Sequence, residues 1–333
     1  MSKIIMSACT VIFATAAAIS FSGCANEPID TQVIEISEKV SIRDYEMTLE
    51  GRQVAIRESG ASDSYPIFYA HGNPGSRLEV AFFADKAMEY GFRLISFDRP
   101  GFGGSDYVTP YSLTDYAKDV EKIADKLGIN HYGAMGWSSG GPPSLAAGFV
   151  SSQRVDFVIS ASGYTDFGEY PQAVQLMDEK GLKGPELSES RPRLFNIVLD
   201  ATQWTERHLP KFYMRMAMAE MTESDKAVLN ETWKRDLFAA SQKSALTQDI
   251  QGVKQDLETQ WAPWEFTLKQ VQVPVQVIQG KKDTFVPWQF AEHICSQVPD
   301  CQLNLIDDVG HLASLTSEVQ DKIFRFSLKH ASR

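Results

Sequence analysis

The sequence predicts an α/β fold, with a mostly parallel central sheet flanked by helices. From Ile42 onward, short apolar runs that suit buried strands alternate with segments of helical periodicity. This alternation stops between residues 165 and 266, where helical stretches rich in Met, Phe and Trp replace the strands, and it then resumes. Such an insertion is best placed as a cap over the carboxyl ends of the strands, where α/β folds bind ligands. A separate helical domain without a catalytic role is the alternative.

The individual elements follow from the local patterns. Arg43–Leu49 and Gln53–Glu58 alternate in hydrophobicity around Glu50-Gly51, which predicts an opening hairpin. Short apolar runs predict six buried strands, at Pro66–Ala70, Arg93–Phe97, Tyr132–Met135, Val155–Ser160, Val273–Gly280 and Gln302–Ile306. Helical spacing outside the insertion is found at Val80–Tyr90, Leu113–Leu127, Ser139–Val150, Trp288–Gln297 and Ala313–Lys329.

Composition excludes several classes of protein. The chain has 333 residues, of which 43% are hydrophobic, and a formal net charge of −11. That apolar content supports a folded core and excludes disordered, collagen-like and disulfide-scaffold proteins. The excess of acidic residues disfavours binding to the negatively charged phosphate backbone of nucleic acids, so no nucleic-acid partner is expected. We expect a monomer or a small homo-oligomer.

The first 23 residues have the pattern of a secretory signal peptide. Lys3 precedes an uncharged apolar run over residues 4–21, and small residues follow it. The sequence FSGC, which ends at Cys24, resembles the lipobox of bacterial lipoproteins, and this implies cleavage before Cys24 and a lipid on its sulfur. Ala25 after the cysteine resembles the pattern of enterobacterial outer-membrane sorting. An uncleaved membrane anchor and a simple signal peptide cleaved nearby are the alternatives.

Residues 24–41 read as a polar, acidic tether between that lipid and the folded domain. The expected location is therefore the bacterial cell envelope, with membrane contact through Cys24. Because export leads to an oxidising compartment, Cys295 and Cys301 can form a disulfide there. Two buried free thiols are the alternative, since only geometry decides.

A nucleophile is predicted where a strand turns into a helix. Gly136-Trp137-Ser138-Ser139-Gly140 follows an expected strand, and its glycines permit a turn tight enough to push Ser138 out above the sheet. A serine hydroxyl needs a base, and the base needs a carboxylate to orient it. Asp283 and His311 follow the last two expected strands, so both can meet Ser138 at one edge of the sheet.

Other acids and histidines compete with this assignment. Asp166, shortly after the strand Val155–Ser160, is a rival for the role of the acid. The remaining histidines are expected to be structural or solvated, and none has ligand spacing with an acid, so no metal site is predicted. They are His71, His131, His208, His293 and His330.

Together these residues resemble the α/β-hydrolase family over almost all of residues 42–333. His71–Ser76 resembles the oxyanion loop of the family, and Asp98–Ser105 resembles a structural turn after the next strand. The family order of serine, acid and histidine carries over onto Ser138, Asp283 and His311. The resemblance implies a core at 42–164 and 267–333, a cap at 165–266, and an oxyanion hole formed by the backbone N–H groups of Asn73 and Ser139.

The resemblance implies a serine hydrolase of the carboxylesterase type, which cleaves a small-molecule ester of a small to medium apolar acyl group and needs no cofactor. Ser138 stands where dehalogenases and epoxide hydrolases of this fold carry Asp, which argues against their chemistry. The alternatives with the same triad are a C–C hydrolase, a perhydrolase, an amidase and an aminopeptidase, the last with Glu206 or Glu220 holding an amino group. A non-catalytic ligand-binding lipoprotein is the alternative of a different class.

Overall fold

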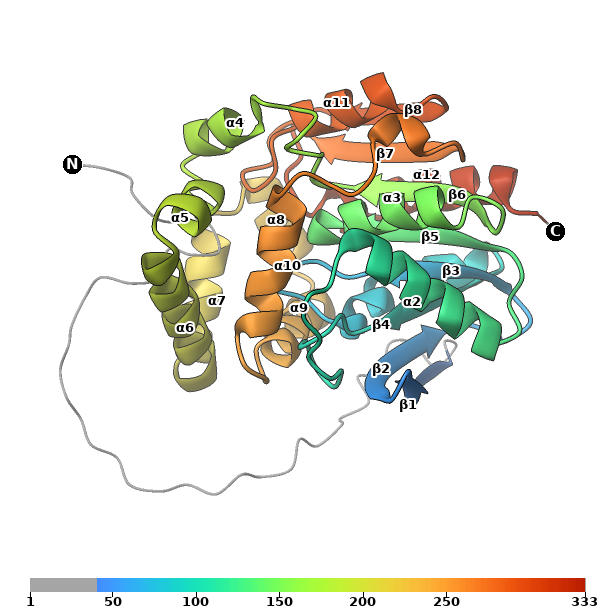
Figure 1. Ribbon diagram of the computed structural model, residues 1–333, viewed down its shortest axis with the longest axis horizontal. Coiled ribbons are helices and arrows are strands. Elements are labelled where there is room, and N and C mark those ends of the chain that lie inside the picture. The colour runs from blue at the N-terminus through green and yellow to red at the C-terminus, as the bar shows by residue number, and fades with distance from the viewer. Residues whose placement is uncertain (1–40, 333) are drawn as a thin grey trace.

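The structure is a computed structural model that describes residues 41–332 (Figure 1). The expected signal peptide, Cys24 and nearly all of the expected tether lie outside the described residues. Within residues 41–332, no helix is both long enough and apolar enough to span a bilayer. The sheet, its covering helices and the cap all fall between Ile42 and His330, so this part of the chain contains a complete folded unit.

The predicted sheet is present, with eight strands in the order β1-β2-β4-β3-β5-β6-β7-β8. The pairs β1/β2 and β2/β4 are antiparallel, and all other neighbouring pairs are parallel. The strands are β1 (Ile42–Leu49), β2 (Arg52–Ser59), β3 (Tyr65–Ala70), β4 (Phe92–Phe97), β5 (Tyr132–Trp137), β6 (Val155–Ala161), β7 (Val275–Gly280) and β8 (Cys301–Ile306).

The opening hairpin turns at the two residues that the sequence suggested. Glu50 and Gly51 have φ values of 51° and 86°, which is the left-handed pair that a two-residue turn needs to match the twist of its strands. The parallel strands read instead as continuous apolar runs, because helices cover both of their faces. Every residue of β4, β5 and β7 is buried.

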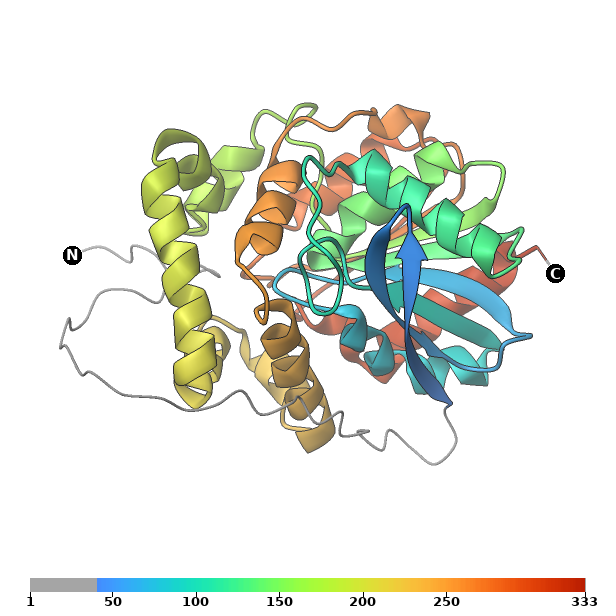
Figure 2. The same ribbon diagram turned by 60° about the horizontal axis from the view of Figure 1, so that its bottom comes forward.

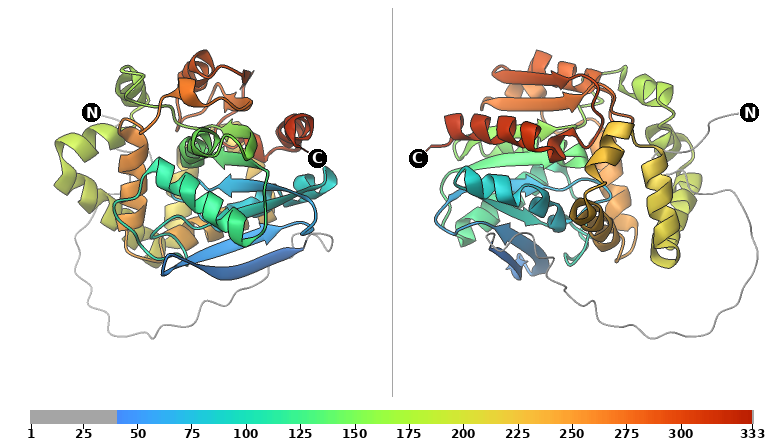
Figure 3. Two further views of the ribbon diagram at one scale, coloured as in Figure 1. Left: turned by 45° about the vertical axis from the view of Figure 1, so that its right-hand side comes forward. Right: turned by 180° about the vertical axis from the view of Figure 1, so that it is seen from behind.

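Two helical layers sandwich the sheet. One apolar core lies under α2 (Leu113–Lys126), α3 (Gly141–Val150) and α11 (Gln289–Gln297). The other lies under α1 (Ala84–Glu89) and α12 (Ser317–His330). Figure 3 shows α12 on the face of the sheet opposite α2 and α3.

Two expected helices are divided differently in the structure. The segment expected as one helix over Val80–Tyr90 consists of a 3-10 helix, η1 (Arg77–Phe82), and the short helix α1, which are separated at Phe83, where φ is −109°. The last helix begins at Ser317 rather than Ala313, because Thr316 is extended with a ψ of 145°. Apolar spacing continues through both junctions, so periodicity alone does not reveal them.

Seven α-helices lie between β6 and β7 and form the cap at the carboxyl ends of the strands (Figures 1 and 2). They are α4 (Ala173–Glu179), α5 (Gly184–Ser190), α6 (Pro192–His208), α7 (Pro210–Ala219), α8 (Glu223–Val228), α9 (Thr232–Ala245) and α10 (Gln251–Trp261). A buried ion pair joins the cap to the core, because Arg99 Nε lies 2.6 Å from Asp256 Oδ1 on α10.

Candidate active site

Ser138 lies at the sharp turn between β5 and α3. Its φ of 56° is in the left-handed region, which is uncommon for a residue with a side chain and is found where the surrounding structure imposes it. The neighbouring glycines are required by close contacts. A Cβ on Gly136 would collide with the carbonyl oxygen of Gly140, and one on Gly140 would collide with that of Ala70. The turn thus places Ser138 on the wall of a cavity above the sheet.

Asp283 and His311 meet in the loops that follow β7 and β8. His311 Nδ1 lies 2.7 Å from Asp283 Oδ2, and the carboxylate is fully buried. Asp283 Oδ1 accepts the backbone N–H groups of Phe285 and Val286 at 2.8 and 2.9 Å, and Gln279 Nε2 donates to Oδ2 at 2.8 Å. These donors hold the carboxylate in one orientation toward His311.

Burial and charge act in opposite directions on His311. Burial of the imidazole would lower the pKa of His311, but the adjacent Asp283 carboxylate and its hydrogen bond outweigh that effect. The pKa of His311 is therefore raised above its usual value of 6.5. With Nδ1 facing Asp283, the other ring nitrogen, Nε2, is the one left to exchange protons on the cavity side.

The rival acid, Asp166, has a structural role instead. Its Oδ1 accepts the backbone N–H groups of Gly168 at 2.8 Å and Trp264 at 3.2 Å, and so fixes the points where the chain enters and leaves the cap. Asp283 is the carboxylate that contacts the ring of His311.

The loop that carries His311 is also held from the cap. Asp225 on α8 is buried, and its carboxylate accepts the backbone N–H groups of His311 at 3.2 Å and Leu312 at 2.7 Å. On the sheet side, Trp137 Nε1 donates to the carbonyl oxygen of His311 at 3.1 Å. The sequence Thr222-x-x-Asp225 could have located the start of α8 as a capping box, but it gave no sign of this long-range contact.

The loop after β3 forms the opposite wall of the cavity. The side-chain amide of Asn73 faces α10, where it donates to Val253 O at 3.1 Å and to Asp256 Oδ2 at 2.7 Å. Arg99 Nη2 donates to Gly72 O at 3.2 Å. Ser139 lies in the first turn of the helix after the elbow, where backbone N–H groups lack partners within the helix and are available to an anion.

Glu79 is a site residue that the sequence analysis missed. It lies on η1 and lines the cavity, yet it is only 3% exposed. Its Oε2 accepts the N–H of Gly72 at 2.8 Å and the hydroxyl of Tyr69 at 3.1 Å. Burial raises the pKa of Glu79 to about 7, although both hydrogen bonds and the charges of Arg99 and His311 oppose this rise. The carboxyl group thus holds the loop after β3, and burial brings its pKa close to neutral pH.

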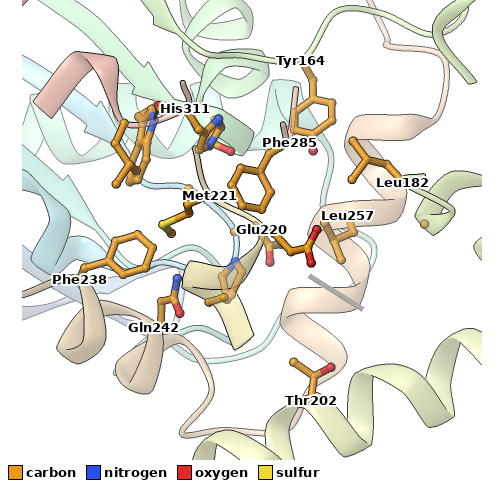
Figure 4. A pocket seen from close by; sticks show the side chains of 18 of the residues that line it. Tyr164, Leu182, Thr202, Glu220, Met221, Phe238, Gln242, Leu257, Phe285 and His311 are labelled. Atoms are coloured by element: carbon orange, nitrogen blue, oxygen red, sulfur yellow. Dashed lines mark hydrogen bonds between the residues drawn. The ribbon is translucent and has the colours of Figure 1, made fainter. Parts of the chain in front are cut away.

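The cavity has a volume of about 140 Å³ and lies between the carboxyl edge of the sheet and the cap. Figure 4 shows Glu220, Met221, Phe238 and Phe285 around it, with His311 at one side. The lining is mostly apolar, as is usual for a site that binds a small organic ligand. Of the two cap acids considered for an amino group, Glu220 lines this cavity, whereas the buried Glu206 is not part of its wall.

The remaining predicted residues lie apart from the cavity. Cys295 on α11 and Cys301 at the start of β8 are joined by a disulfide. His71 is buried, with its Nε2 accepting the N–H of Arg99 at 3.1 Å, and His293 Nδ1 lies 2.7 Å from Thr165 Oγ1. Across residues 41–332, no cluster of three or more His, Cys, Asp or Glu side chains is suited to a metal ion.

Comparison with known proteins places the chain in a family. The family model for the alpha/beta hydrolase fold matches residues 65–318. The chain is 26% identical over 282 residues to 2-hydroxy-6-oxononadienedioate/2-hydroxy-6-oxononatrienedioate hydrolase of Paraburkholderia phymatum, which covers 81% of this chain and 89% of that protein. The chain therefore belongs to the α/β-hydrolase fold family.

Solved structures agree on the fold. An alpha/beta hydrolase fold protein from Chitinophaga pinensis superposes with a TM-score of 0.64 at 18% identity, over 86% of this chain and 95% of that one. Naproxen esterase (carboxylesterase NP) from Bacillus subtilis superposes with a TM-score of 0.61 at 19% identity, over 87% and 92%. These likenesses extend over both the sheet and most of the remaining chain, and they establish the architecture.

Proposed function

We propose that the protein is a serine hydrolase that cleaves the ester of a small apolar acyl group through an acyl-enzyme intermediate. The observation that carries this proposal is the contact of 2.7 Å between His311 Nδ1 and the buried Asp283 carboxylate, at the wall of a cavity that Ser138 also lines. A histidine held in this way has one nitrogen committed to the acid and the other available to a hydroxyl group.

In the proposed reaction, Ser138 Oγ attacks the carbonyl carbon of the ester while its proton passes to His311 Nε2. The carbonyl oxygen gains the negative charge, and the backbone N–H groups of Asn73 and Ser139 stabilise it. Collapse of this intermediate breaks the bond to the alcohol oxygen, which takes the proton from His311. Water then loses a proton to His311 and attacks the acyl carbon. The bond from that carbon to Ser138 Oγ breaks, Oγ takes the proton back from His311, and the acid leaves.

Glu79 contributes to this reaction through the oxyanion loop. By accepting the N–H of Gly72, it holds the peptide between His71 and Gly72, one residue before the proposed oxyanion donor Asn73. An ionised carboxylate here would oppose the negative charge that develops on the substrate oxygen, whereas a protonated one does not. The raised pKa of Glu79, about 7, therefore favours catalysis at pH values where the carboxyl group remains neutral.

The size of the cavity limits the acyl group. Its volume of about 140 Å³ is similar to that of an engineered protein cavity of about 150 Å³ that holds benzene. An acyl chain of about six carbon atoms would fill such a space. Short and medium acyl esters are therefore the proposed substrate class.

The proposed location is the bacterial cell envelope, with a lipid on Cys24. The sequence around Cys24 and the Cys295–Cys301 disulfide support it, because such bonds persist in exported proteins. Growth of a bacterial expression host with radiolabelled palmitate tests it. The full chain should be labelled and Cys24→Ala should not, and equal labelling of both would contradict lipidation at Cys24.

Labelling with a fluorophosphonate probe tests the nucleophile. Wild type should react, Ser138→Ala should not, and the Ser139→Ala control should keep most of the labelling because its expected donor is a backbone N–H. Hydrolysis of p-nitrophenyl esters of increasing chain length then measures the acyl pocket. A folded protein that binds no probe and cleaves no ester would refute the hydrolase proposal.

C–C bond hydrolysis with the same residues is the second candidate, and it is favoured by the relative from Paraburkholderia phymatum. In that reaction water attacks a ketone carbonyl and a carbon takes the place of the alcohol as leaving group. Side-by-side assays with a p-nitrophenyl ester and a vinylogous 1,5-diketone distinguish the two. A kcat/KM at least about 100-fold higher on the diketone would overturn the ester proposal.

A further inference from the structure

The outer surface of the cap carries an unusual group of exposed apolar side chains. Ile197 is 58% exposed and Trp204 54% on α6, while Leu209 is 47% exposed and Phe212 37% at the start of α7. These are four of the nine exposed large hydrophobic residues in residues 41–332, and they fall within 16 consecutive positions. Single exposed apolar residues need no explanation, but a group of them marks an interaction surface.

The helical spacing places these residues on the outside of the cap. Ile197 and Trp204 are seven residues apart and so share one face of α6. The opposite face of α6 is packed into the cap core through Phe195 and Leu199. Figures 1 and 2 show α6 and α7, together with α5, at the end of the molecule away from the sheet, and no other described helix or strand covers the outer side of α6. The face is therefore open to a partner.

The charge around this face is opposite to that of the protein as a whole. Although the chain has a net charge of −11, residues 191–219 have five exposed basic side chains and one exposed acid, Asp200. The basic residues are Arg191, Arg193, Arg207, Lys211 and Arg215. Basic side chains beside Trp, Phe, Leu and Ile are the combination that binds the interface of an anionic lipid bilayer.

We infer that the outer face of α6 and α7 docks onto an anionic membrane surface. We call the four residues Ile197, Trp204, Leu209 and Phe212, with the five basic residues around them, the docking face. Trp and Phe would enter the boundary between head groups and acyl chains, while Lys and Arg contact lipid phosphates.

The length of chain before the domain allows this contact together with the proposed lipid on Cys24. The 18 residues from Cys24 to Ser41 can reach about 60 Å when extended, so the anchor does not prevent the cap from turning toward the bilayer. The several acyl chains of such an anchor would hold the protein at the membrane, and the basic apolar face would orient the domain on it. α6 and α7 also supply Thr202, Tyr213 and Met216 to the cavity wall, so the docking face and part of that wall are on the same two helices.

Vesicle flotation tests the docking face without dependence on catalysis. The protein starting at Ser41 retains every described element and lacks the proposed anchor, so any binding comes from the domain. It should float with phosphatidylcholine vesicles that contain about 30% phosphatidylglycerol, and not with pure phosphatidylcholine. Binding should weaken at about 1 M NaCl, where surface charges are screened.

Two double variants separate the apolar and basic contributions. Trp204→Ser with Phe212→Ser should lower the partition coefficient at least about tenfold, because each ring buries a large apolar area. Arg193→Glu with Lys211→Glu should lower it at least about fivefold for each cation removed. The control, Leu303→Ser with Leu328→Ser, removes two exposed leucines elsewhere and should change nothing. Thermal unfolding of each variant verifies that it is folded.

Three results would overturn the inference. The first is failure of the wild-type domain to float with anionic vesicles. The second is an equal loss of binding in the leucine control. The third is a concentration-dependent dimer in sedimentation that the Trp204→Ser, Phe212→Ser variant dissociates, since that assigns the face to a second copy of the chain.

Discussion

The two walls of the cavity differ in how tightly they are fixed. On the sheet side, Ser138, Asp283 and His311 are each at most 9% exposed, and they follow the parallel strands β5, β7 and β8 of one sheet. On the cap side, Met216 and Ala217 are only half-buried, on a helix whose other face is open to solvent. The difference supports the proposal that the sheet side carries the chemistry, while the cap shapes the space for the substrate and presents the proposed docking face.

One cap residue, Asp225, contacts the sheet side of the site. Asp225 belongs to α8, but its carboxylate holds the backbone of the histidine loop. The cap is therefore more than a cover, because part of the alignment of His311 depends on it.

Asp283→Asn should reduce kcat by about 10⁴-fold, because the amide cannot hold the histidine tautomer or stabilise the imidazolium. Asp166→Asn is the matched control, since Asp166 only accepts backbone N–H groups, and it should change kcat less than about threefold. Steady-state kinetics on p-nitrophenyl butyrate measures both. An equal loss in the two variants would remove the distinction between the acids.

Asp225→Ala should lower kcat by about 10²-fold with little change in KM, because the loop that carries His311 loses two hydrogen bonds and the base moves out of line. Asp225→Asn retains an acceptor and should recover part of the rate. Full activity of a folded Asp225→Ala protein would show that residues on the sheet side are sufficient to align His311.

The pH profile separates His311 from Glu79. His311 must be neutral to accept a proton, and Asp283 raises its pKa, so kcat/KM should rise with pH through a midpoint above 6.5. Ionisation of Glu79, with a pKa of about 7, should limit the rate on the alkaline side. Glu79→Gln should remove this alkaline limb, and the expected gain at high pH is up to about tenfold.

Glu79→Ala is the comparison variant for the pH profile of Glu79→Gln. It removes the acceptor for Gly72 N–H and should lower kcat at every pH, whereas Gln keeps an acceptor without the charge. If both variants keep the wild-type profile, then Glu79 has no part in the reaction.

Met216→Phe should have the smallest effect. It narrows the cavity from the cap side, so hydrolysis of a hexanoate ester should fall about fivefold while that of the acetate changes less than twofold. Met218→Phe, on the same helix but outside the cavity wall, is the control. Equal effects on both esters would place the acyl group elsewhere.

Most residues on the sheet side of the site could be named from the sequence. The elbow around Ser138 is recognisable because its glycines, strand and helix are contiguous, and Asp283 and His311 each follow a predicted strand. Glu79 and Asp225 were not recognisable, because each acts through a backbone N–H that the sequence does not mark. The pairing of Asp225 with His311 spans 86 residues, and neither element predicts the other. In the cap, periodicity predicted helices, but not which of their faces would remain exposed.

The most direct test of the central claim is detection of the acyl enzyme itself. Rapid acid quenching after mixing with p-nitrophenyl butyrate, followed by peptide mass spectrometry, should find one butyryl group on Ser138 and a burst of p-nitrophenol of matching size. The adduct should be absent from Ser138→Ala. If His311→Ala slows deacylation more than acylation, the adduct should accumulate in that variant. Turnover of the ester without any adduct on Ser138, or with an adduct at another residue, would contradict the account.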